Sequence, residues 1–325
     1  MGSTIKVGNG HMPAVGLGLW KIDQQVAAQA VFEAIEVGYR HLDSACDYGN
    51  ERQVGDGMRQ AIDTGLCQRD ELWITSKLWN TYHEPQYVEA ACRKTLDDLQ
   101  TDYLDLYLIH FPIALKYVDF DCRYPPEWFF DPDAPNPRME IEAVGLHETW
   151  HAMEGLVERG LVKNIGVCNY TSALLHDLMA YATIKPALLQ IESHPHLTQE
   201  ALIRAAHNHD VQVTAFSPLG ALSYVALEGA NDADSVLLEP VVIAAAQRVK
   251  RTAAQVVLRW GIQRGTAIIP KTTRPQRLRE NLDLFNFELH ADEMADISAL
   301  NINRRFNDPG IFCESAFNTF YPIYD

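Results

Sequence analysis

Four side chains able to carry or exchange protons follow three apolar, strand-like segments of the sequence. Asp43 and Tyr48 lie in the stretch LDSACDYGNE, Lys77 lies in ITSKLWN, and His110 lies in YLIHFP. An ammonium group beside a phenol favours the phenolate and lowers its pKa, and a carboxylate keeps such an ammonium charged away from water. A neutral imidazole can donate a hydrogen bond that orients a carbonyl group. The combination predicts a site that donates a proton during carbonyl chemistry, with Tyr48 as the acid.

The elements needed to bring these residues together are strands that alternate with helices. Short apolar runs are typical of buried strands, and the segments between them carry apolar residues at helical spacing. Strands connected only through helices run parallel, and eight of them close most naturally into a (β/α)8 TIM barrel. The alternative is a doubly wound sheet, but GLGLW lacks the third glycine of a dinucleotide fingerprint. The predicted strands are 15–17, 40–42, 72–75, 104–109, 164–167, 187–190, 211–215 and 267–269.

Three further stretches lie outside this alternation. Asn9-Gly10, between two short apolar runs, predicts an N-terminal β-hairpin. Residues 112–144, rich in proline, aspartate and aromatic residues, form a loop much longer than usual, and the tail 301–325 has no helical period. Catalytic residues of such barrels lie at the carboxyl ends of the strands. We therefore expect one domain spanning residues 1–325, with the loop and the tail covering the active-site mouth at this C-terminal face.

The composition is typical of a globular protein with a large core: 47% of the 325 residues are hydrophobic and 22% are charged. A formal net charge of −16 opposes a general affinity for nucleic acid or anionic lipid. The six cysteines have no metal-ligand spacing, and the pair His194 and His196 has no third ligand nearby, so we expect no metal. No secretory leader or membrane-spanning run is evident. These features predict a cytoplasmic protein with a small-molecule partner.

Several motifs resemble those of the aldo-keto reductases and occur in the order of that family. They are GYRHLDSACDYGNE, ITSKLWN, YLDLYLIHFP, GVCNY, LLQIESHPH, TAFSPLG and IPKTTRPQRLREN, and the similarity extends from about residue 8 to residue 309. The resemblance implies a (β/α)8 barrel that binds NADPH and reduces an aldehyde or ketone. It implies that Tyr48 donates the proton and that Lys77 and Asp43 tune its acidity. His110 would then orient the carbonyl group.

The resemblance also implies an extended cofactor site. Asn169 and Gln190 would hydrogen-bond the nicotinamide carboxamide, and Phe216 would stack on its ring. Cys168 stands where a serine often contacts the carboxamide, so that bond is weakened or absent. The other implied cofactor residues are Trp20 at the nicotinamide, Ser217 and Leu219 at the pyrophosphate, Lys271, Thr272, Thr273 and Arg277 at the adenosine 2′-phosphate, and Glu280 and Asn281 near the adenine.

The segment KTTRPQR independently favours a phosphate site. Pro275 suits the first turn of a helix whose N-terminus faces the end of the last strand, and such helix ends bind anions. Lys271, Arg274 and Arg277 place three cations within seven residues of an acidic chain. NADPH is therefore predicted in preference to NADH. Xylose reductases that use both NADPH and NADH hold the cofactor ribose with a glutamate. That glutamate has no counterpart at the matching position after SPLG, although Glu228 lies nearby. Weaker use of NADH therefore stays open.

Aromatic side chains are expected to form the substrate pocket beside His110. Trp20, Trp79 and Phe111 would wall it, and Asn307, in RRFNDP, corresponds to an asparagine that contacts sugar hydroxyls in xylose reductases. The first predicted reaction is therefore reduction of an open-chain, xylose-like aldose to its alditol. QIESHPH and PIYD also resemble mannose-6-phosphate reductases, so an aldose-6-phosphate reductase or a broad aldehyde reductase is an alternative. A nicotinamide-binding regulatory subunit is a remote one, and a monomer and a homodimer are both open.

Overall fold

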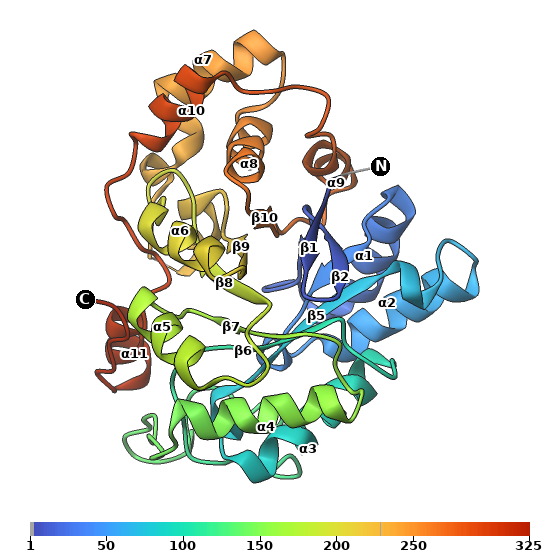
Figure 1. Cartoon of the computed structure of the whole chain (residues 1–325), viewed down its shortest axis with the longest axis vertical. Helices are drawn as coiled ribbons and strands as arrows, with labels where there is room; N and C mark the ends of the chain where they lie inside the picture. Colours follow the sequence, from blue (N-terminus) through green and yellow to red (C-terminus); the bar gives the residue numbers. More distant parts are fainter. Residues whose placement is uncertain (1–2, 228) are drawn as a thin grey trace.

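Eight parallel strands form the centre of the computed structural model, which describes residues 3–227 and 229–325 (Figure 1). Each strand pairs with the next one along the chain, from β3 to β10. A parallel bridge between Val15 and Ile268 joins the last strand to the first, so the sheet closes. The predicted (β/α)8 barrel is confirmed. The strands are β3 (Leu17–Gly18), β4 (His41–Asp43), β5 (Trp73–Leu78), β6 (Leu106–Ile109), β7 (Ile165–Cys168), β8 (Leu188–Glu192), β9 (Gln212–Phe216) and β10 (Ala267–Ile268).

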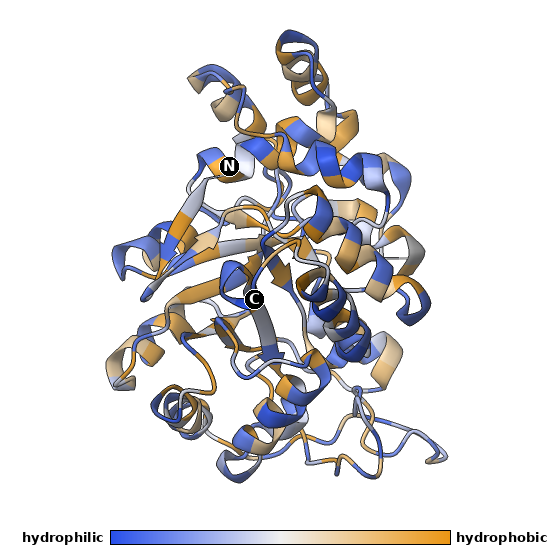
Figure 2. Cartoon of the chain, turned by 90° about the vertical axis from the view of Figure 1, so that its right-hand side faces the viewer, coloured by the Kyte–Doolittle hydropathy of each residue, from blue (hydrophilic) through white to orange (hydrophobic). Residues whose placement is uncertain are grey.

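Helices surround the strands, and hydrophobic and hydrophilic residues alternate along their ribbons (Figure 2). In α1 the residues Ala27, Ala30, Val31, Ala34 and Ile35 are buried, which is the spacing of one helical face. Hydrophobic residues on one side and charged residues on the other thus suffice to dock a helix on the barrel. The helices are α1 (Gln24–Val37), α2 (Glu51–Asp63), α3 (Pro85–Leu99), α4 (Leu146–Glu158), α5 (Ser172–Tyr181), α6 (Glu200–Asn208), α7 (Pro240–Val249), α8 (Ala253–Gln263), α9 (Pro275–Leu282), α10 (Ala291–Ser298) and α11 (Pro309–Phe317).

Three sequence predictions need correction. The N-terminal hairpin of β1 (Thr4–Val7) and β2 (Gly10–Pro13) is present, but its turn residues are Gly8 and Asn9, one position earlier than predicted. The tail 301–325 contains the helix α11, which the sequence did not predict. The side chain of Asp308 caps its first turn by accepting a hydrogen bond from the Gly310 amide. The helices α7 and α10 were not predicted; with α8 they enclose a small core of their own around Trp260.

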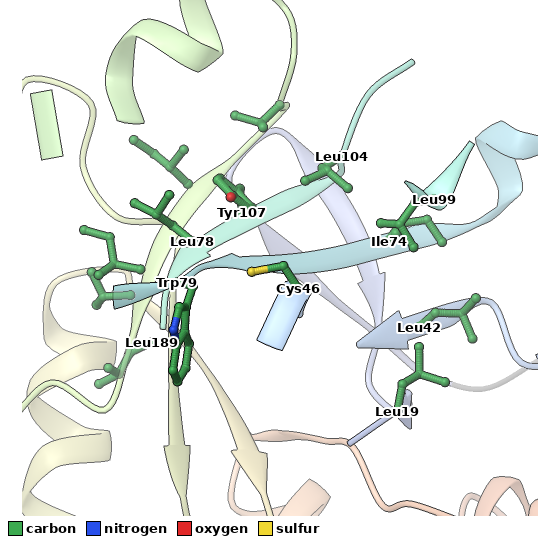
Figure 3. Packing of buried hydrophobic residues seen from close by; sticks show 14 of the residues in the cluster. Leu19, Leu42, Cys46, Ile74, Leu78, Trp79, Leu99, Leu104, Tyr107 and Leu189 are labelled. Carbon is green, nitrogen blue, oxygen red and sulfur yellow. The ribbon is translucent and has the colours of Figure 1, made fainter. Parts of the chain in front are cut away.

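The alternation of side chains along β5 separates two cores. Ile74 and Leu78 point outward and pack under the helices, as do Leu42 and Tyr107 on the neighbouring strands (Figure 3). Trp73 lies on the opposite face with residues of the hairpin and of β6, β8 and β10, inside the barrel. The hairpin therefore fills the amino-terminal end of the barrel, and the interior positions nearest the carboxyl ends of the strands are left for polar residues.

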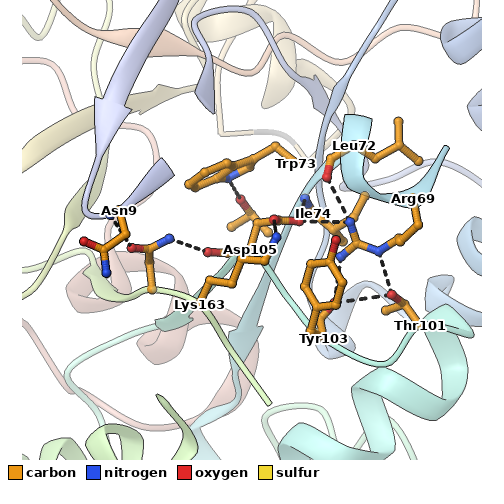
Figure 4. A network of polar contacts seen from close by, with 11 residues as sticks. Asn9, Arg69, Leu72, Trp73, Ile74, Thr101, Tyr103, Asp105 and Lys163 are labelled. Carbon is orange, nitrogen blue, oxygen red and sulfur yellow. Dashed lines mark hydrogen bonds and ion pairs between the residues drawn. The ribbon is translucent and has the colours of Figure 1, made fainter. Parts of the chain in front are cut away.

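A buried carboxylate ties the amino-terminal ends of the strands together (Figure 4). Asp105, directly before β6, is 4% exposed. Its Oδ2 accepts hydrogen bonds from Arg69 Nη1 at 3.0 Å and from the Ile74 amide at 3.0 Å, and its Oδ1 lies 3.1 Å from Lys163 Nζ. This face of a (β/α)8 barrel serves stability rather than chemistry.

We expect Asp105→Ala to lower the free energy of unfolding by about 2–4 kcal/mol, because it leaves two cations and a buried amide without their acceptor. Urea unfolding measures the loss, and Asp63→Ala at the exposed end of α2 is the matched control, expected within about 0.5 kcal/mol of wild type. Turnover per folded molecule should stay near wild type. An equal effect of the two substitutions on stability would contradict the role assigned to Asp105.

Candidate active site

The polar interior positions at the carboxyl ends of the strands carry the predicted residues. Asp43 is the last residue of β4 and Lys77 is the fifth of β5, two positions after Thr75 on the same inward face. His110 directly follows β6, and its ring lies edge-on to Tyr48 with the centroids 5.9 Å apart. Tyr48 ends the short 3-10 helix Cys46–Tyr48 that follows β4. The fold brings all four side chains to one place.

Lys77 is the centre of this cluster. Its ammonium Nζ donates hydrogen bonds to Asp43 Oδ1 at 2.6 Å, to the Ser44 carbonyl at 2.7 Å and to Tyr48 OH at 3.0 Å. These three acceptors match the three N–H groups of an ammonium. The side chains of Lys77 and Asp43 are 0% and 1% exposed. The amine therefore has one fixed orientation, with one of its hydrogens directed at the phenol.

The pKa values of the cluster follow from burial and from these contacts. Burial favours the neutral amine of Lys77, but Asp43 and then Tyr48 outweigh it and raise the pKa of Lys77, which stays charged. Burial raises the pKa of Tyr48, Lys77 lowers it and Asp43 raises it again, with a net rise. Lys77 thus lowers the pKa of the phenol, as the sequence predicts, but burial outweighs this effect, so the net shift is not the predicted lowering. Burial, followed by Lys77, holds the pKa of His110 well below its usual range, so the imidazole is neutral.

Aromatic rings stand beside His110. The Trp79 ring is edge-on to His110 at 5.3 Å and to Phe111 at 6.2 Å, and its Nε1 donates to the Glu127 carbonyl at 3.0 Å. Trp128, in the long loop, lies 4.8 Å from Trp79. The Trp128 ring also contacts two phenylalanines of α11 at 5.4 Å. The long loop 112–144 and the tail 301–325 thus meet beside Trp79 and Phe111, two of the predicted substrate-binding residues.

The residues expected at the nicotinamide also gather around the cluster. Gln190 Nε2 donates to Asp43 Oδ2 at 2.6 Å, and the Cys168 thiol lies 3.9 Å from Gln190 Oε1. Asn169 Nδ2 donates to the His110 carbonyl at 2.9 Å, and Asn169 Oδ1 accepts from Tyr324 OH at 3.1 Å. Phe216 is half-buried at the end of β9. The contact of Tyr324 with this group was not predicted, and the aromatic tail gives no spacing signal for it.

A second group of predicted residues follows β10. Lys271 and Arg277 are exposed, Thr272 is buried, and α9 begins at Pro275 as the sequence suggested. Lys21 was not predicted, although it directly follows Trp20. Its Nζ donates to the Ser223 carbonyl at 2.6 Å.

Lys21 and Lys271 bring two positive charges to this part of the rim. Burial, and then the positive charge of Lys271, lower the pKa of Lys21 to about 8. Two ammonium groups that repel one another across the rim favour an anion between them. A bound anion would raise the pKa of Lys21.

The remaining predicted residues are distributed along the rim. Asn307 Nδ2 lies 3.4 Å from Tyr224 OH, the Tyr224 hydroxyl lies 3.0 Å from Ser217 Oγ, and the Tyr224 ring is 5.8 Å from that of Trp20. Glu228 lies outside the described residues. The other placements are Leu219, partly buried between two core clusters, Thr273, exposed before α9, and Glu280 and Asn281, partly and fully buried on α9.

The described residues contain neither a metal-binding cluster nor a membrane-spanning helix. Across residues 3–227 and 229–325, no three His, Cys, Asp or Glu side chains come together as a metal-ligand set. In the same part of the chain, no helix has both the length and the apolar composition needed to cross a bilayer.

The comparisons with known proteins agree with this geometry. The model of the aldo/keto reductase family matches residues 6–302. The chain belongs to the aldo/keto reductase family. Probable NAD(P)H-dependent D-xylose reductases of Arthroderma otae and Aspergillus fumigatus are 46% and 48% identical to it, over 98% and 94% of this chain and 96% and 97% of theirs.

Solved members of the aldo/keto reductase family have the same fold. The aldose reductase of Schistosoma japonicum superposes with a TM-score of 0.87 at 35% identity, covering 99% of both chains. A Bombyx mori aldo-keto reductase in complex with NADP superposes with a TM-score of 0.85, also at 35% identity and 99% of both chains. The family resemblance of the motifs is therefore confirmed over nearly the whole length.

Proposed function

We propose that this aldo/keto reductase reduces the open-chain aldehyde of a xylose-like aldose to the alditol, with NADPH as the reductant. The observation that carries the proposal is the contact of the Lys77 ammonium with both Asp43 and Tyr48, beside a neutral His110. The full-length similarity to probable NAD(P)H-dependent D-xylose reductases supports the substrate class.

The residues at the rim fit a phosphate-bearing nicotinamide cofactor. Lys21 and Lys271 repel one another, and Arg277 stands exposed on the first turns of α9, whose N-terminus is itself favourable to anions. At the other end, Asn169 and Gln190 are buried amides next to the catalytic cluster, suited to hold a carboxamide. When bound, the nicotinamide supplies the hydride; the chain supplies position and a proton.

The chain's own part in the reaction is proton transfer from Tyr48. As negative charge develops on the carbonyl oxygen, the phenol releases its proton, and Lys77, 3.0 Å away, stabilises the phenolate that forms. Asp43 keeps the buried amine charged. His110, neutral, donates a hydrogen bond to the same oxygen and so selects the orientation of the carbonyl.

The aromatic wall and Asn307 would account for an aldose. Trp79 and Phe111 offer apolar surface to the carbon chain, and Asn307 offers an amide to hydroxyl groups. For a hexose 6-phosphate the mouth would need available cations, and two cations of the long loop are already engaged by other groups. Lys116 pairs with Glu140, and Arg123 donates to backbone carbonyls of its own loop. In the tail, Arg304 lies over the Phe306 ring and Arg305 over the Tyr324 ring, and neither forms an ion pair with a carboxylate among the described residues, so a sugar phosphate stays the alternative substrate.

The test is NADPH oxidation, followed by its absorbance, with xylose, other aldoses, a hexose 6-phosphate and simple aldehydes. The proposal expects the highest kcat/KM among sugars for a pentose. A higher value for the hexose 6-phosphate would overturn the substrate class, and NADPH binding without oxidation by any carbonyl would favour a regulatory subunit.

We further propose that residues 1–325 form one catalytic domain, in which the loop 112–144 and the tail 301–325 cover the mouth. The contacts of Trp128 with Trp79 and with α11 support this. A cytoplasmic location is proposed on the free state of all six cysteines. Light scattering after size-exclusion chromatography decides between a monomer and a homodimer.

We expect Arg277→Ala to raise the KM for NADPH by about 10- to 100-fold, because a charge-assisted bond to the 2′-phosphate contributes about 1.5–3 kcal/mol. The KM for NADH, which lacks that phosphate, should change by less than about twofold. Arg279→Ala, exposed on the same helix, is the matched control and should leave both values near wild type. Equal losses for the two cofactors would place the 2′-phosphate elsewhere.

A further inference from the structure

Glu192 is a buried acid that the proposed reaction does not use. It is the last residue of β8, two positions after Gln190, so both side chains lie on the inward face of the strand. Glu192 is 0% exposed. A carboxyl group shielded from water is unfavourable unless hydrogen-bond donors surround it. The donors around Glu192 therefore show what holds it at the mouth of the barrel.

Two of these donors are backbone amides of the tail. The Phe306 amide donates to Glu192 Oε1 at 2.9 Å, and the Asn307 amide donates to Oε2 at 2.8 Å. The ring Nε2 of His194 lies 3.0 Å from Oε1. The segment between α10 and α11 carries no regular secondary structure and runs along the left-hand edge of the molecule in the view of Figure 1. Glu192 thus fixes an irregular segment to the rigid end of a strand.

The side chain of Asn307 also has a polar contact. Its Nδ2 lies 3.4 Å from Tyr224 OH, and the Tyr224 ring stacks on Phe306 with a centroid distance of 5.5 Å and an interplanar angle of 16°. Asn307 Oδ1 is buried and has no hydrogen-bond partner among the residues that the structure describes. This oxygen can therefore accept a hydrogen bond from a donor that binds beside it.

We propose that Glu192 is a positioning residue for sugar specificity, which holds the backbone of Phe306 and Asn307 so that the free Asn307 Oδ1 meets a hydroxyl group of the substrate. The inference rests on the proposed aldose reduction. Glu192 does not touch the substrate; it acts through Asn307. Its effect must therefore depend on the hydroxyl groups of the substrate and vanish when the Asn307 amide is absent.

Glu192→Gln keeps the size of the side chain but turns an N–H donor towards one of the tail amides. We expect the KM for xylose to rise about tenfold, because loss of a buried acceptor displaces Asn307. The kcat/KM for pentanal, which has the same carbon number and no hydroxyl group on its chain, should stay within about twofold of wild type. Glu314→Gln, on the exposed face of α11, is the matched control, with both substrates unchanged.

A double-mutant cycle shows whether the effect passes through Asn307. In an Asn307→Ala background, Glu192→Gln should raise the KM for xylose by less than about twofold, because the group that it positions is gone. Additive effects in the cycle, or equal losses for xylose and pentanal, would overturn the inference, since a merely structural glutamate damages both substrates.

Tyr224→Phe keeps the test decisive if Glu192→Gln fails to fold. It removes the hydroxyl that meets Asn307 Nδ2 and should raise the KM for xylose about threefold at saturating NADPH, with pentanal unaffected. No change for xylose would count against the inference. A wild-type protein that oxidises NADPH with pentanal but not with any aldose overturns the proposed function itself. If the wild type reduces xylose but the Glu192→Gln and Tyr224→Phe variants affect xylose and pentanal equally, only the role of Glu192 is overturned.

Discussion

Tyr48→Phe is expected to lower kcat for xylose by about 1,000-fold, because general acid catalysis by a positioned side chain contributes about 100- to 10,000-fold. The phenol is the only one of the four clustered groups that combines a proton with a pKa above neutrality and a cation ready to stabilise its conjugate base. The affinity for NADPH, measured by fluorescence titration, should stay within about twofold of wild type.

The matched control for this prediction is Tyr107→Phe. Tyr107 is fully buried on β6 and packs in the core between the strands and the helices (Figure 3). Loss of its hydroxyl should leave kcat near wild type. A Tyr48→Phe variant that keeps a tenth or more of the wild-type kcat, about 1.4 kcal/mol of barrier or less, would show that another group delivers the proton.

The strands were predictable because the buried runs are short and apolar, and several of them are followed by a polar residue of the candidate site. The hairpin turn was shifted by one residue because Gly8-Asn9 and Asn9-Gly10 are both good turn dipeptides. Pairing decides between them. In the observed register Val7 pairs with Gly10 and Met12 pairs with Ile5, and Val7 and Met12 are fully buried at the end of the barrel; a turn at Asn9-Gly10 would instead pair Val7 with Met12.

The helix α11 could not be predicted from the spacing of its apolar residues, because some of them pack against the long loop and others are exposed to solvent. Phe312 and Phe317 contact Trp128 of the long loop, whereas Ile311 is 67% exposed. No single apolar face results, so the period of 3.6 residues is lost. Tertiary contacts, together with the Asp308 cap, decide this segment.

The identities of the catalytic residues were readable in the sequence, but their electrostatics were not. Gln190 and Asp43 are 147 positions apart and meet because β8 and β4 lie across the barrel from one another. The sequence shows that a lysine is available to Tyr48, but the pKa of the phenol depends on how much burial opposes that lysine and on how far Asp43 cancels its charge. Both are properties of the closed fold.

Lys77→Met is expected to lower kcat by about 1,000-fold, comparable to Tyr48→Phe, because the phenolate then forms beside Asp43 without a cation. The substitution also leaves the Asp43 carboxylate buried and unpaired, which should lower the free energy of unfolding by about 3–5 kcal/mol. Steady-state kinetics at a temperature where the variant is folded, with urea unfolding alongside, measure the two effects separately.

The double variant Lys77→Met with Asp43→Asn separates stability from catalysis. Asparagine keeps the shape of Asp43 and removes the unpaired charge, so most of the lost stability should return, since replacing both members of a buried ion pair is often nearly neutral. The rate should not return, because the phenolate still has no cation 3.0 Å away. If kcat recovered with stability, the loss in Lys77→Met would have come from the stranded carboxylate. If it stays low in a stable protein, the ammonium itself provides the rate by stabilising the charge that Tyr48 acquires.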